Sequence, residues 1–421
     1  MNSKKENKIK NIWMLNHYGI PPELGPLNRH YMFAKNLNNR GYNTTIFASS
    51  ALHYTNENMI TTNEDYIVKK YSNVPFIFLK TNNYYGNGKK RIINMYQYFK
   101  QVIKLTKKIN IEKPDVIFAT SPHPLTWLAG YFLAKRYKVK LIVETRDLWP
   151  EVLIHMGGLK RKGLIATLLF KLEKFIYNKA DKLVFTVEGG KDYLEEIGID
   201  PSKANYINNG IDIDEFNYNK ENNIYEDIDL DDNYHYKIVY TGSMGVANEL
   251  NYIVETAKMF RDNGYNNIKF ILFGDGYKKP ELEKYVEENN LKNVKFKGLV
   301  EKKYIPNILT KSNLNIYTGK NIPLYKYGLS LNKMFDYFAS GIPTLSNFDS
   351  GYDMLEENKV GITVKSGSVE ALYEGILRFN NMDKKEYDTY SKNSLKLAKD
   401  FDFKILTDKL EEIIKDIENN I

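Results

Sequence analysis

The chain has 421 residues, no Cys and a formal net charge of +8, with 43% hydrophobic and 27% charged residues. This composition is typical of a globular protein with two or three domains, and the lack of Cys excludes disulfides, thiolate metal sites and a Cys nucleophile. Residues 1–200 carry a net charge of +14 and the remaining residues a net −6, which indicates two halves with different partners.

The N-terminal residues 1–10 are polar and charged, unlike a signal peptide. No apolar run reaches the roughly 18 residues that a membrane-spanning helix needs. We therefore expect a cytoplasmic protein.

Strand and helix patterns alternate along the first half, as in a parallel α/β sheet. We predict strands at 11–15, 44–48, 116–119, 140–143 and 182–186, and helices at 28–40, 125–136 and 162–179.

A polar stretch at 212–232 precedes a second alternating series and marks a linker at 212–236. Strands are predicted at 237–240, 268–273 and 342–345, and helices at 248–262, 331–340 and 401–421. The predicted fold is α/β, with two doubly wound Rossmann-like domains, residues 1–211 and 237–399, facing a central cleft. The last helix, at about 400–421, is expected to join the first domain.

Three polar segments follow predicted strands of the first half. The loop 18–27 contains Gly25 but not the G-x-G-x-x-G fingerprint, which argues against a dinucleotide dehydrogenase. His123 follows the strand 116–119, where it is either a binding residue or a satisfied loop histidine. Asp147 and Glu151 lie in an acidic segment with Arg146, and either carboxylate could orient a hydroxyl and accept its proton unless Arg146 merely staples the loop.

In the second half, Gly242, Ser243 and Gly245 follow a strand, where backbone amides and a hydroxyl suit a phosphate. The segment 326–343 is the most informative, because a flexible loop there opens a helix whose apolar residues recur at helical spacing. Lys326, Lys333 and the helix N-terminus suit a diphosphate, and Asp336 suits ribose hydroxyls. The alternative without a ligand is a surface ion pair between Lys333 and Asp336.

The chain resembles glycosyltransferase family 4 enzymes of the GT-B fold and, within them, the bacterial surface-polysaccharide branch of WbuB-like fucosaminyl transferases. The resemblance rests on Pro21-Pro22-Glu23-Leu24-Gly25-Pro26, Arg146-Asp147-Leu148-Trp149-Pro150-Glu151, Asn208-Asn209-Gly210-Ile211-Asp212, Gly274-Asp275-Gly276 and the segment 326–343. It implies transfer of a sugar, such as an N-acetylated amino or deoxyamino sugar, from a UDP-type nucleotide to an acceptor hydroxyl. It also implies retention of anomeric configuration and no metal or other cofactor.

The resemblance implies that the C-terminal domain holds the donor and the N-terminal domain the acceptor. Asp336 would grip the ribose, Val300 would meet the base, and Gly25 would face the pyrophosphate and sugar. The remaining implied donor residues are Gly274, Tyr327, Gly328, Leu329, Ser330 and Asn332. Two features depart from the family pattern: its Glu-x7-Glu pair is Gly328 and Asp336 here, and residues 241–250 contain no Lys or Arg.

We expect the amides of Gly25, Gly242, Ser243 and Leu329, with Lys333, to stabilise charge on the leaving diphosphate. The basic cluster Lys160, Arg161 and Lys162 precedes an apolar helix with interspersed lysines, a pattern of either an interfacial or a core-packed helix. The interfacial alternative predicts a peripheral protein on the inner face of the cytoplasmic membrane that uses a lipid-linked saccharide. The family resemblance implies O-antigen or capsule synthesis as its setting.

Two rival functions remain open, a nucleotide-sugar 2-epimerase of the same fold and a non-catalytic sugar- or lipid-binding scaffold. Nucleic-acid binding is not expected, because the basic clusters lack interleaved aromatic residues and the C-terminal half is acidic.

Overall fold

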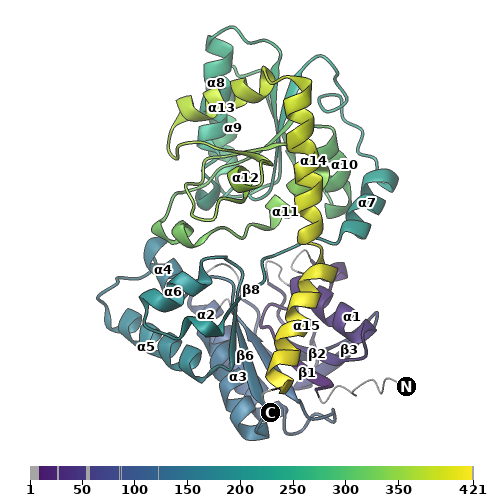
Figure 1. The fold of residues 1–421 in the computed structure, drawn as a ribbon, viewed down its shortest axis with the longest axis vertical. Helices are drawn as coiled ribbons and strands as arrows, with labels where there is room; N and C mark the ends of the chain where they lie inside the picture. Colours follow the sequence, from purple (N-terminus) through teal and green to yellow (C-terminus); the bar gives the residue numbers. More distant parts are fainter. Residues whose placement is uncertain are drawn as a thin grey trace. The chain divides into compact units, whose positions relative to one another are not determined.

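The structure, a computed structural model, describes residues 9–25, 28–53, 57–84, 86, 88–121 and 123–419. It divides into two compact units (Figure 1). Unit 1 comprises Met1–Asn208 and Phe403–Ile421, and unit 2 comprises Asn209–Asp402.

Unit 1 is built on an eight-stranded sheet in the order β3-β4-β2-β1-β5-β6-β7-β8. Its strands are β1 (Asn11–Leu15), β2 (Asn43–Ser49), β3 (Tyr66–Tyr71), β4 (Val74–Leu79), β5 (Val116–Thr120), β6 (Lys140–Thr145), β7 (Lys182–Phe185) and β8 (Ala204–Tyr206). All neighbours pair in parallel except the edge hairpin β3–β4. The central strands read as continuous apolar runs because helices cover both faces of the sheet.

The helices of unit 1 are α1 (Arg29–Asn39), α2 (Lys89–Leu105), α3 (Pro124–Tyr137), α4 (Glu151–His155), α5 (Leu164–Lys179), α6 (Gly190–Glu196) and α15 (Phe403–Asn419). Helix α1 connects β1 to β2, on one side of β1 in the sheet, whereas α3 connects β5 to β6, on the other side. Right-handed crossovers therefore place these two helices on opposite faces of the sheet. The C-terminal helix α15, yellow in Figure 1, packs beside α1.

Unit 2 is a six-stranded parallel sheet in the doubly wound order β11-β10-β9-β12-β13-β14. Its strands are β9 (Tyr236–Thr241), β10 (Ile268–Phe273), β11 (Val294–Gly298), β12 (Leu314–Tyr317), β13 (Thr344–Ser346) and β14 (Gly361–Thr363). Its helices are α7 (Ile213–Asn222), α8 (Asn251–Asp262), α9 (Lys279–Glu288), α10 (Ile305–Thr310), α11 (Asn332–Ser340), α12 (Met354–Glu357), α13 (Val369–Asn380) and α14 (Lys384–Asp400). The predicted fold class, with two doubly wound α/β sheets, is confirmed.

The stretch 212–236, expected as a linker, is instead an ordered part of unit 2. Its first half forms α7, and its acidic loop is held by lysines of the sheet and its flank. Lys297 contacts Asp227 at 2.7 Å and Asp229 at 2.6 Å, and Lys311 contacts Asp231 at 2.6 Å. The polar composition predicted a loop, but these long-range ion pairs attach it to the domain.

Candidate functional site

In unit 2 the loops after β9 and β10 touch at the carboxyl ends of these neighbouring strands. The Gly242 amide donates to the Phe273 carbonyl at 3.0 Å. A Cβ on Gly274 would lie 1.8 Å from the Gly242 oxygen, so this contact requires glycine. The bond to Phe273 corrects the expectation that the Gly242 amide faces a phosphate. The Ser243 amide has no acceptor among the described residues, so it and the following Gly245 remain candidates for that role.

Lys333, from the first turn of α11, reaches across to this loop. Its Nζ donates to Tyr240 Oη at 2.9 Å and to Asn248 Oδ1 at 3.3 Å, and it lies 4.3 Å from the centroid of the Tyr240 ring. A Cβ on Gly242 would lie 2.8 Å from the same nitrogen. Burial lowers the pKa of the Lys333 ammonium to about 7, and no carboxylate of the described residues pairs with it. In the described part of unit 2, the carboxyl end of β9 therefore carries a buried amine with no anion beside it to stabilise its protonated form.

The alternative of a Lys333–Asp336 surface pair does not occur. Asp336, half-buried one turn further along α11, forms no hydrogen bond or ion pair with the described residues. Burial raises the pKa of its carboxyl, Lys302 opposes that shift and Glu215 adds to it. Lys302 lies just beyond Val300, so the carboxylate and the loop predicted to meet the base belong to one neighbourhood.

The loop before α11 is a short 3-10 helix, Pro323–Tyr327, followed by an extended segment. Lys326 Nζ lies 4.7 Å from the Tyr327 ring centroid, and Gly328 has a positive φ of 102°. Asn209 donates to the Ser330 carbonyl at 3.1 Å, which ties this segment to the start of unit 2. The predicted residues thus lie just before and at the start of α11: Tyr327, Gly328, Leu329, Ser330 and Asn332. The residue that precedes the helix, Leu331, provides no side-chain cap, which leaves first-turn amides for a ligand.

In unit 1, His123 stands where β5 leads into α3 and is 1% exposed. Burial, with repulsion from Arg91, lowers its pKa to about 3, so the imidazole is neutral. Its Nε2 lies 2.9 Å from Nδ1 of His17, which the sequence analysis did not select. His17 follows β1, and β1 pairs with β5, so the two rings meet at one edge of the sheet. In the sequence, His17 could have been selected as a polar residue that follows an apolar strand. Only the strand order shows that this strand, β1, is the neighbour of β5.

Asp147 lies in the loop after β6 and is exposed. The surrounding protein raises the pKa of its carboxyl, and Arg146 opposes the shift. Arg146 forms no ion pair with the residues that the structure describes, so it does not staple the loop. Its amide instead donates to Ser121 Oγ at 2.8 Å, while its buried Nε has no partner among those residues.

Glu151 is not available to orient an acceptor hydroxyl, which corrects its predicted role. Arg161 donates to both of its oxygens, at 2.6 and 2.8 Å, and His155 Nε2 lies 3.6 Å away. The same pair neutralises Arg161, which was predicted to face a membrane. Lys160 and Lys162 are exposed and make no ion pair with the described residues.

The buried carboxylate of this region is Glu144, on β6. It accepts hydrogen bonds from Arg29 Nε at 2.9 Å, from His30 Nε2 at 2.6 Å and from Thr120 Oγ1. Arg29 also donates to the carbonyls of Ile207 and Asn208. The charge of Arg29 and the hydrogen bond from His30 hold the pKa of Glu144 well below its ordinary value despite burial. This network fixes the end of β8 and the loop after it against α1.

Gly25 ends the 3-10 helix Pro22–Leu24, and its amide donates to Pro22 O at 3.4 Å. A Cβ there would lie 2.5 Å from Ile20 Cδ1. Pro26, part of the same predicted motif, lies outside the described residues.

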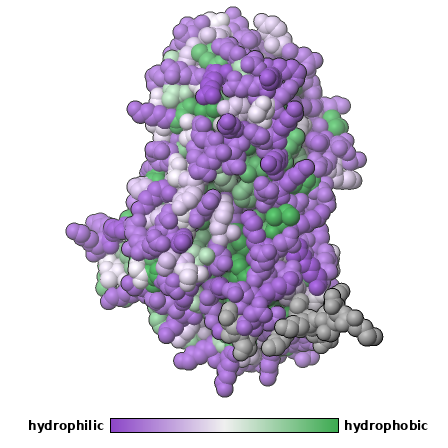
Figure 2. Space-filling view, viewed as in Figure 1, coloured by the Kyte–Doolittle hydropathy of each residue, from purple (hydrophilic) through white to green (hydrophobic). Residues whose placement is uncertain are grey.

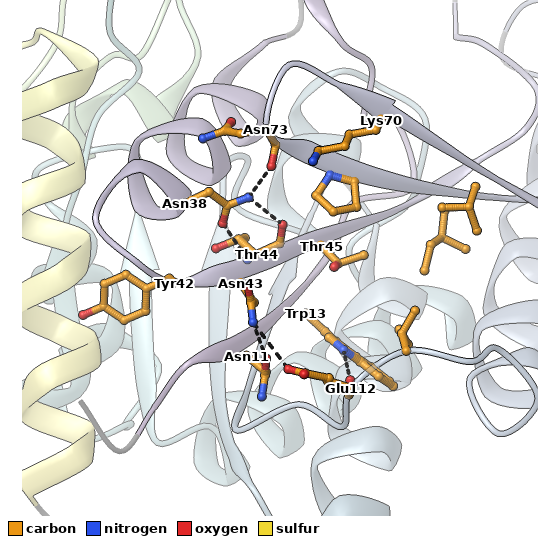
Figure 3. Close-up of a pocket in the computed structure, with 14 residues that line it drawn as sticks. Asn11, Trp13, Asn38, Tyr42, Asn43, Thr44, Thr45, Lys70, Asn73 and Glu112 are labelled. Carbon is orange, nitrogen blue, oxygen red and sulfur yellow. Dashed lines mark hydrogen bonds between the residues drawn. The ribbon is translucent and has the colours of Figure 1, made fainter. Parts of the chain in front are cut away.

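A separate cavity of 390 Å³ in unit 1 lies at the amino ends of β1 and β2, over the hairpin β3–β4 (Figure 3). Asn38, Asn73 and Thr44 form a hydrogen-bonded group on its wall, and Lys70 and Glu112 lie at separate places around it. The described residues that line it include none of the predicted site residues. In parallel α/β sheets ligands bind at the carboxyl ends, so this cavity is not the candidate active site.

Among the described residues, no three His, Asp or Glu side chains are grouped so that they could hold a metal ion. Within the same ranges, no helix combines the length and apolar character needed to cross a bilayer.

The sequence matches two family profiles. The profile described as Glycosyltransferase Family 4 covers residues 28–215, and the one described as Glycosyl transferases group 1 covers residues 235–381. The chain is 25% identical over 340 residues to an Escherichia coli UDP-Gal:alpha-D-GlcNAc-diphosphoundecaprenol alpha-1,3-galactosyltransferase, covering 78% of this chain and 82% of that protein. It is 22% identical over 213 residues to the putative colanic acid biosynthesis glycosyl transferase WcaI of Escherichia coli K12, covering 49% of this chain and 51% of that one.

Solved structures show the same fold over nearly the whole chain. Sucrose-phosphate synthase from Thermosynechococcus elongatus superposes with a TM-score of 0.75 at 16% identity, covering 98% of this chain and 100% of that one. HepE from Anabaena, solved in complex with UDP, superposes with a TM-score of 0.69 at 12% identity, covering 97% and 100%.

Proposed function

The chain belongs to the family-4 glycosyltransferases, and we propose that it transfers a sugar from a UDP-type nucleotide to a lipid-linked saccharide in bacterial surface polysaccharide synthesis. The observation that carries the proposal is Lys333, a buried amine that touches the glycine loop after β9 and has no carboxylate partner in the described ranges. A diphosphate supplies the missing negative charge, and the uncapped start of α11 adds amide donors. The Asp336 carboxylate, also without a partner among the described residues, suits ribose hydroxyls.

In the proposed reaction, the bond between the sugar C1 and the diphosphate oxygen breaks while the acceptor oxygen bonds to C1. The acceptor hydroxyl passes its proton to the departing diphosphate oxygen, and the nucleoside diphosphate leaves. Lys333 and the Ser243 amide stabilise the charge that develops on the leaving group. Asp147, exposed after β6, is the carboxylate we assign to orient the acceptor hydroxyl, now that Glu151 is bound to Arg161. We further propose that transfer needs no metal, because Lys333 and backbone amides offer the electrostatic support for the diphosphate. Retention of anomeric configuration is proposed from the family resemblance alone.

The lipid-linked acceptor is proposed by analogy with the relative from Escherichia coli, whose name specifies a diphosphoundecaprenol substrate. The surface of unit 1 supports the proposal. On α5, Leu164 is 75% exposed, Ile165 63% and Leu168 56%, so one face of this helix is apolar and uncovered. Most of the molecular face in Figure 2 is hydrophilic, as expected for a chain rich in charged residues.

Exposed apolar residues continue from α5 onto α3 and α2. Ring contacts link the three helices: Phe175 packs against Tyr131 at 5.1 Å, and Phe132 packs against Phe99 at 6.3 Å between centroids. Exposed Ile92, Ile93 and Tyr96 extend this surface along α2. Lysines border it at positions 89, 90, 160, 162, 171 and 174. We propose that this α2–α3–α5 surface docks on the anionic inner leaflet of the cytoplasmic membrane.

Transfer is tested by incubating the protein with nucleotide sugars and a lipid-linked monosaccharide, and analysing products by mass spectrometry. Lys333→Ala and Asp336→Ala should lower turnover with every donor, whereas Lys284→Ala, at an exposed position in the middle of α9, should not. Unchanged turnover in both site variants would refute the donor site. A free epimerised sugar formed without acceptor would indicate the 2-epimerase alternative, and failure of every nucleotide to raise the melting temperature would favour a scaffold.

Flotation with liposomes tests the docking surface. The protein should float with vesicles that contain anionic lipid, and Leu164→Asp with Leu168→Asp should abolish flotation. Equal flotation with neutral and anionic vesicles, or no effect of these variants, would refute this role.

A further inference from the structure

A chain of three buried side chains joins α2, β1 and the start of α3 in unit 1. Asn94, on α2, lies 2.6 Å through Oδ1 from His17 Nε2, and His17 Nδ1 lies 2.9 Å from His123 Nε2. All three residues are at most 1% exposed. Tyr18 and Tyr98 pack against the His17 ring, with centroids 4.3 and 4.8 Å away, and restrict its rotation.

The orientation of the first member follows from its other bond. Asn94 Nδ2 donates to the backbone carbonyl of Asn82 at 2.7 Å. A carbonyl only accepts, so this bond excludes the flipped amide and leaves Asn94 Oδ1 as the acceptor toward His17. His17 Nε2 must therefore carry a proton and donate it.

The remaining protons follow in turn. Burial and the neighbouring His123 lower the pKa of His17, so its ring is neutral and Nδ1 is a bare acceptor. His123 Nε2 must then carry the proton that binds His17 Nδ1, with Thr126 Oγ1 at 3.4 Å as a second neighbour. His123 is neutral as well, so its Nδ1 is also a bare acceptor. That atom is buried and has no hydrogen-bond partner in the described part of the chain.

We propose that Asn94 and His17 are positioning residues that hold His123 in the Nε2–H tautomer, so that its Nδ1 accepts a hydrogen bond from a saccharide hydroxyl. The inference rests on the proposed sugar transfer. Few buried acceptors are left unpaired in folded proteins, and a substrate hydroxyl supplies the missing donor when it enters. With the opposite tautomer, Nδ1 would carry a proton and would meet the same hydroxyl only as a donor.

The tautomers are read directly by nitrogen-15 NMR of the full-length protein labelled at histidine, with His17→Gln and His123→Gln used for assignment. We expect both rings to carry their proton on Nε2, and His123 Nδ1 to show the shift of an unprotonated nitrogen that changes when donor or acceptor is added. A proton on His123 Nδ1 would overturn the proposal. This measurement needs no turnover, so it stands even if the proposed reaction fails.

Kinetics give the second test. Asn94→Leu removes the acceptor that starts the chain and should lower kcat/KM by about 10- to 100-fold, the worth of one lost hydrogen bond. In a His123→Leu background, the same Asn94→Leu change should add no further loss, because Asn94 acts only through His123. The proposal would be overturned if the losses from Asn94→Leu and His123→Leu multiply in the double variant, or if a smaller folded fraction explains the whole loss from Asn94→Leu. Thr44→Val is the matched control and should leave kcat/KM unchanged, because it removes a buried hydroxyl at the amino end of β2 that has no partner within the described ranges.

Discussion

Replacing Glu144 with Gln should sharply destabilise unit 1. The substitution keeps the size of the side chain but removes the charge that Arg29 faces at 2.9 Å. The Arg29 side chain is 5% exposed and that of Glu144 0%, so water cannot replace the lost carboxylate. The other guanidinium nitrogens are held by the carbonyls of Ile207 and Asn208, which prevents the cation from turning toward solvent.

Breaking one partner of a buried ion pair costs about 3–5 kcal/mol, because an uncompensated charge remains in the interior. For a domain of this size such a loss lowers the melting temperature by roughly 6–20 °C. Replacing both partners by apolar residues, as in Arg29→Met with Glu144→Leu, should recover only part of the loss. The buried donors His30 and Thr120 and the carbonyls of Ile207 and Asn208 would still lose their hydrogen-bond partners.

Tryptophan fluorescence during urea unfolding measures this effect on unit 1 alone. All three Trp residues of the chain, at positions 13, 127 and 149, belong to that unit. Trp127 Nε1 donates to the Glu144 carbonyl at 2.9 Å, so one of the probes lies beside the substitution. A probe confined to one unit is needed because a chain with two compact units need not unfold in a single step. Glu195→Gln removes the same charge at an exposed position and serves as the control.

The pH dependence gives an independent check. The folded pKa of Glu144 is held below its ordinary value of 4.5, so the unfolded state binds more protons in this range. Its stabilisation is complete above that ordinary value and is lost as the pH falls through the folded pKa. The deficit of Glu144→Gln should therefore shrink on acidification. A deficit under about 1 kcal/mol at pH 7, far below the cost of breaking a buried ion pair, or one that persists unchanged at low pH, would refute this reasoning.

Three further predictions concern other groups. The pKa of Lys333 is about 7, so binding of a nucleoside diphosphate beside it should take up protons at pH 8. Calorimetry in buffers of different ionisation enthalpy measures this proton uptake. The same uptake in Lys333→Met would contradict the prediction. Burial raises the pKa of the Glu173 carboxyl from 4.5 to about 8. As the pH rises between these two values, the free energy of unfolding of unit 1 should therefore fall by an amount on the order of a few kcal/mol. Glu173→Gln should flatten that slope in urea titrations, and an unchanged slope would count against it. Gly274→Ala should destabilise unit 2 by about 1–3 kcal/mol more than Gly264→Ala. Both glycines have a positive φ, but only Gly274 touches another backbone segment. Equal shifts in melting temperature for the two variants would show that the contact between the loops is unimportant.

Most of the strands, and α11, could be predicted because local patterns specify them. Apolar runs indicated most of the parallel strands, and spacing at i, i+3 and i+4 indicated the buried face of α11. The hairpin β3–β4 and helix α2 were not predicted. The alternation in β3 is weak, as its residues are half-buried or exposed, and the turn of the hairpin uses Ser72 at a φ of 53° rather than a glycine.

Partners of charged side chains could not be predicted, because they come from distant parts of the chain. Glu151 and Arg161 were each given a functional role, yet they neutralise each other across ten residues. The acidic stretch 212–236 was expected as a linker, and lysines of β10, β11 and the end of α10 bind it instead.

The local spacing of apolar residues and the residue types at turns specify the α/β class, the alternation of strands and helices, and the residues that follow each strand. These features could therefore be predicted from the sequence. Which of those residues meet depends on how the strands are ordered in space. Strand order brings His17 to His123 and Lys333 to the loop at Gly242, and it buries Glu144 against Arg29. It also changes the meaning of the uneven charge. Part of the excess of positive charge in the first half is neutralised or buried, and the lysines bordering the α2–α3–α5 surface are among those that stay exposed to solvent.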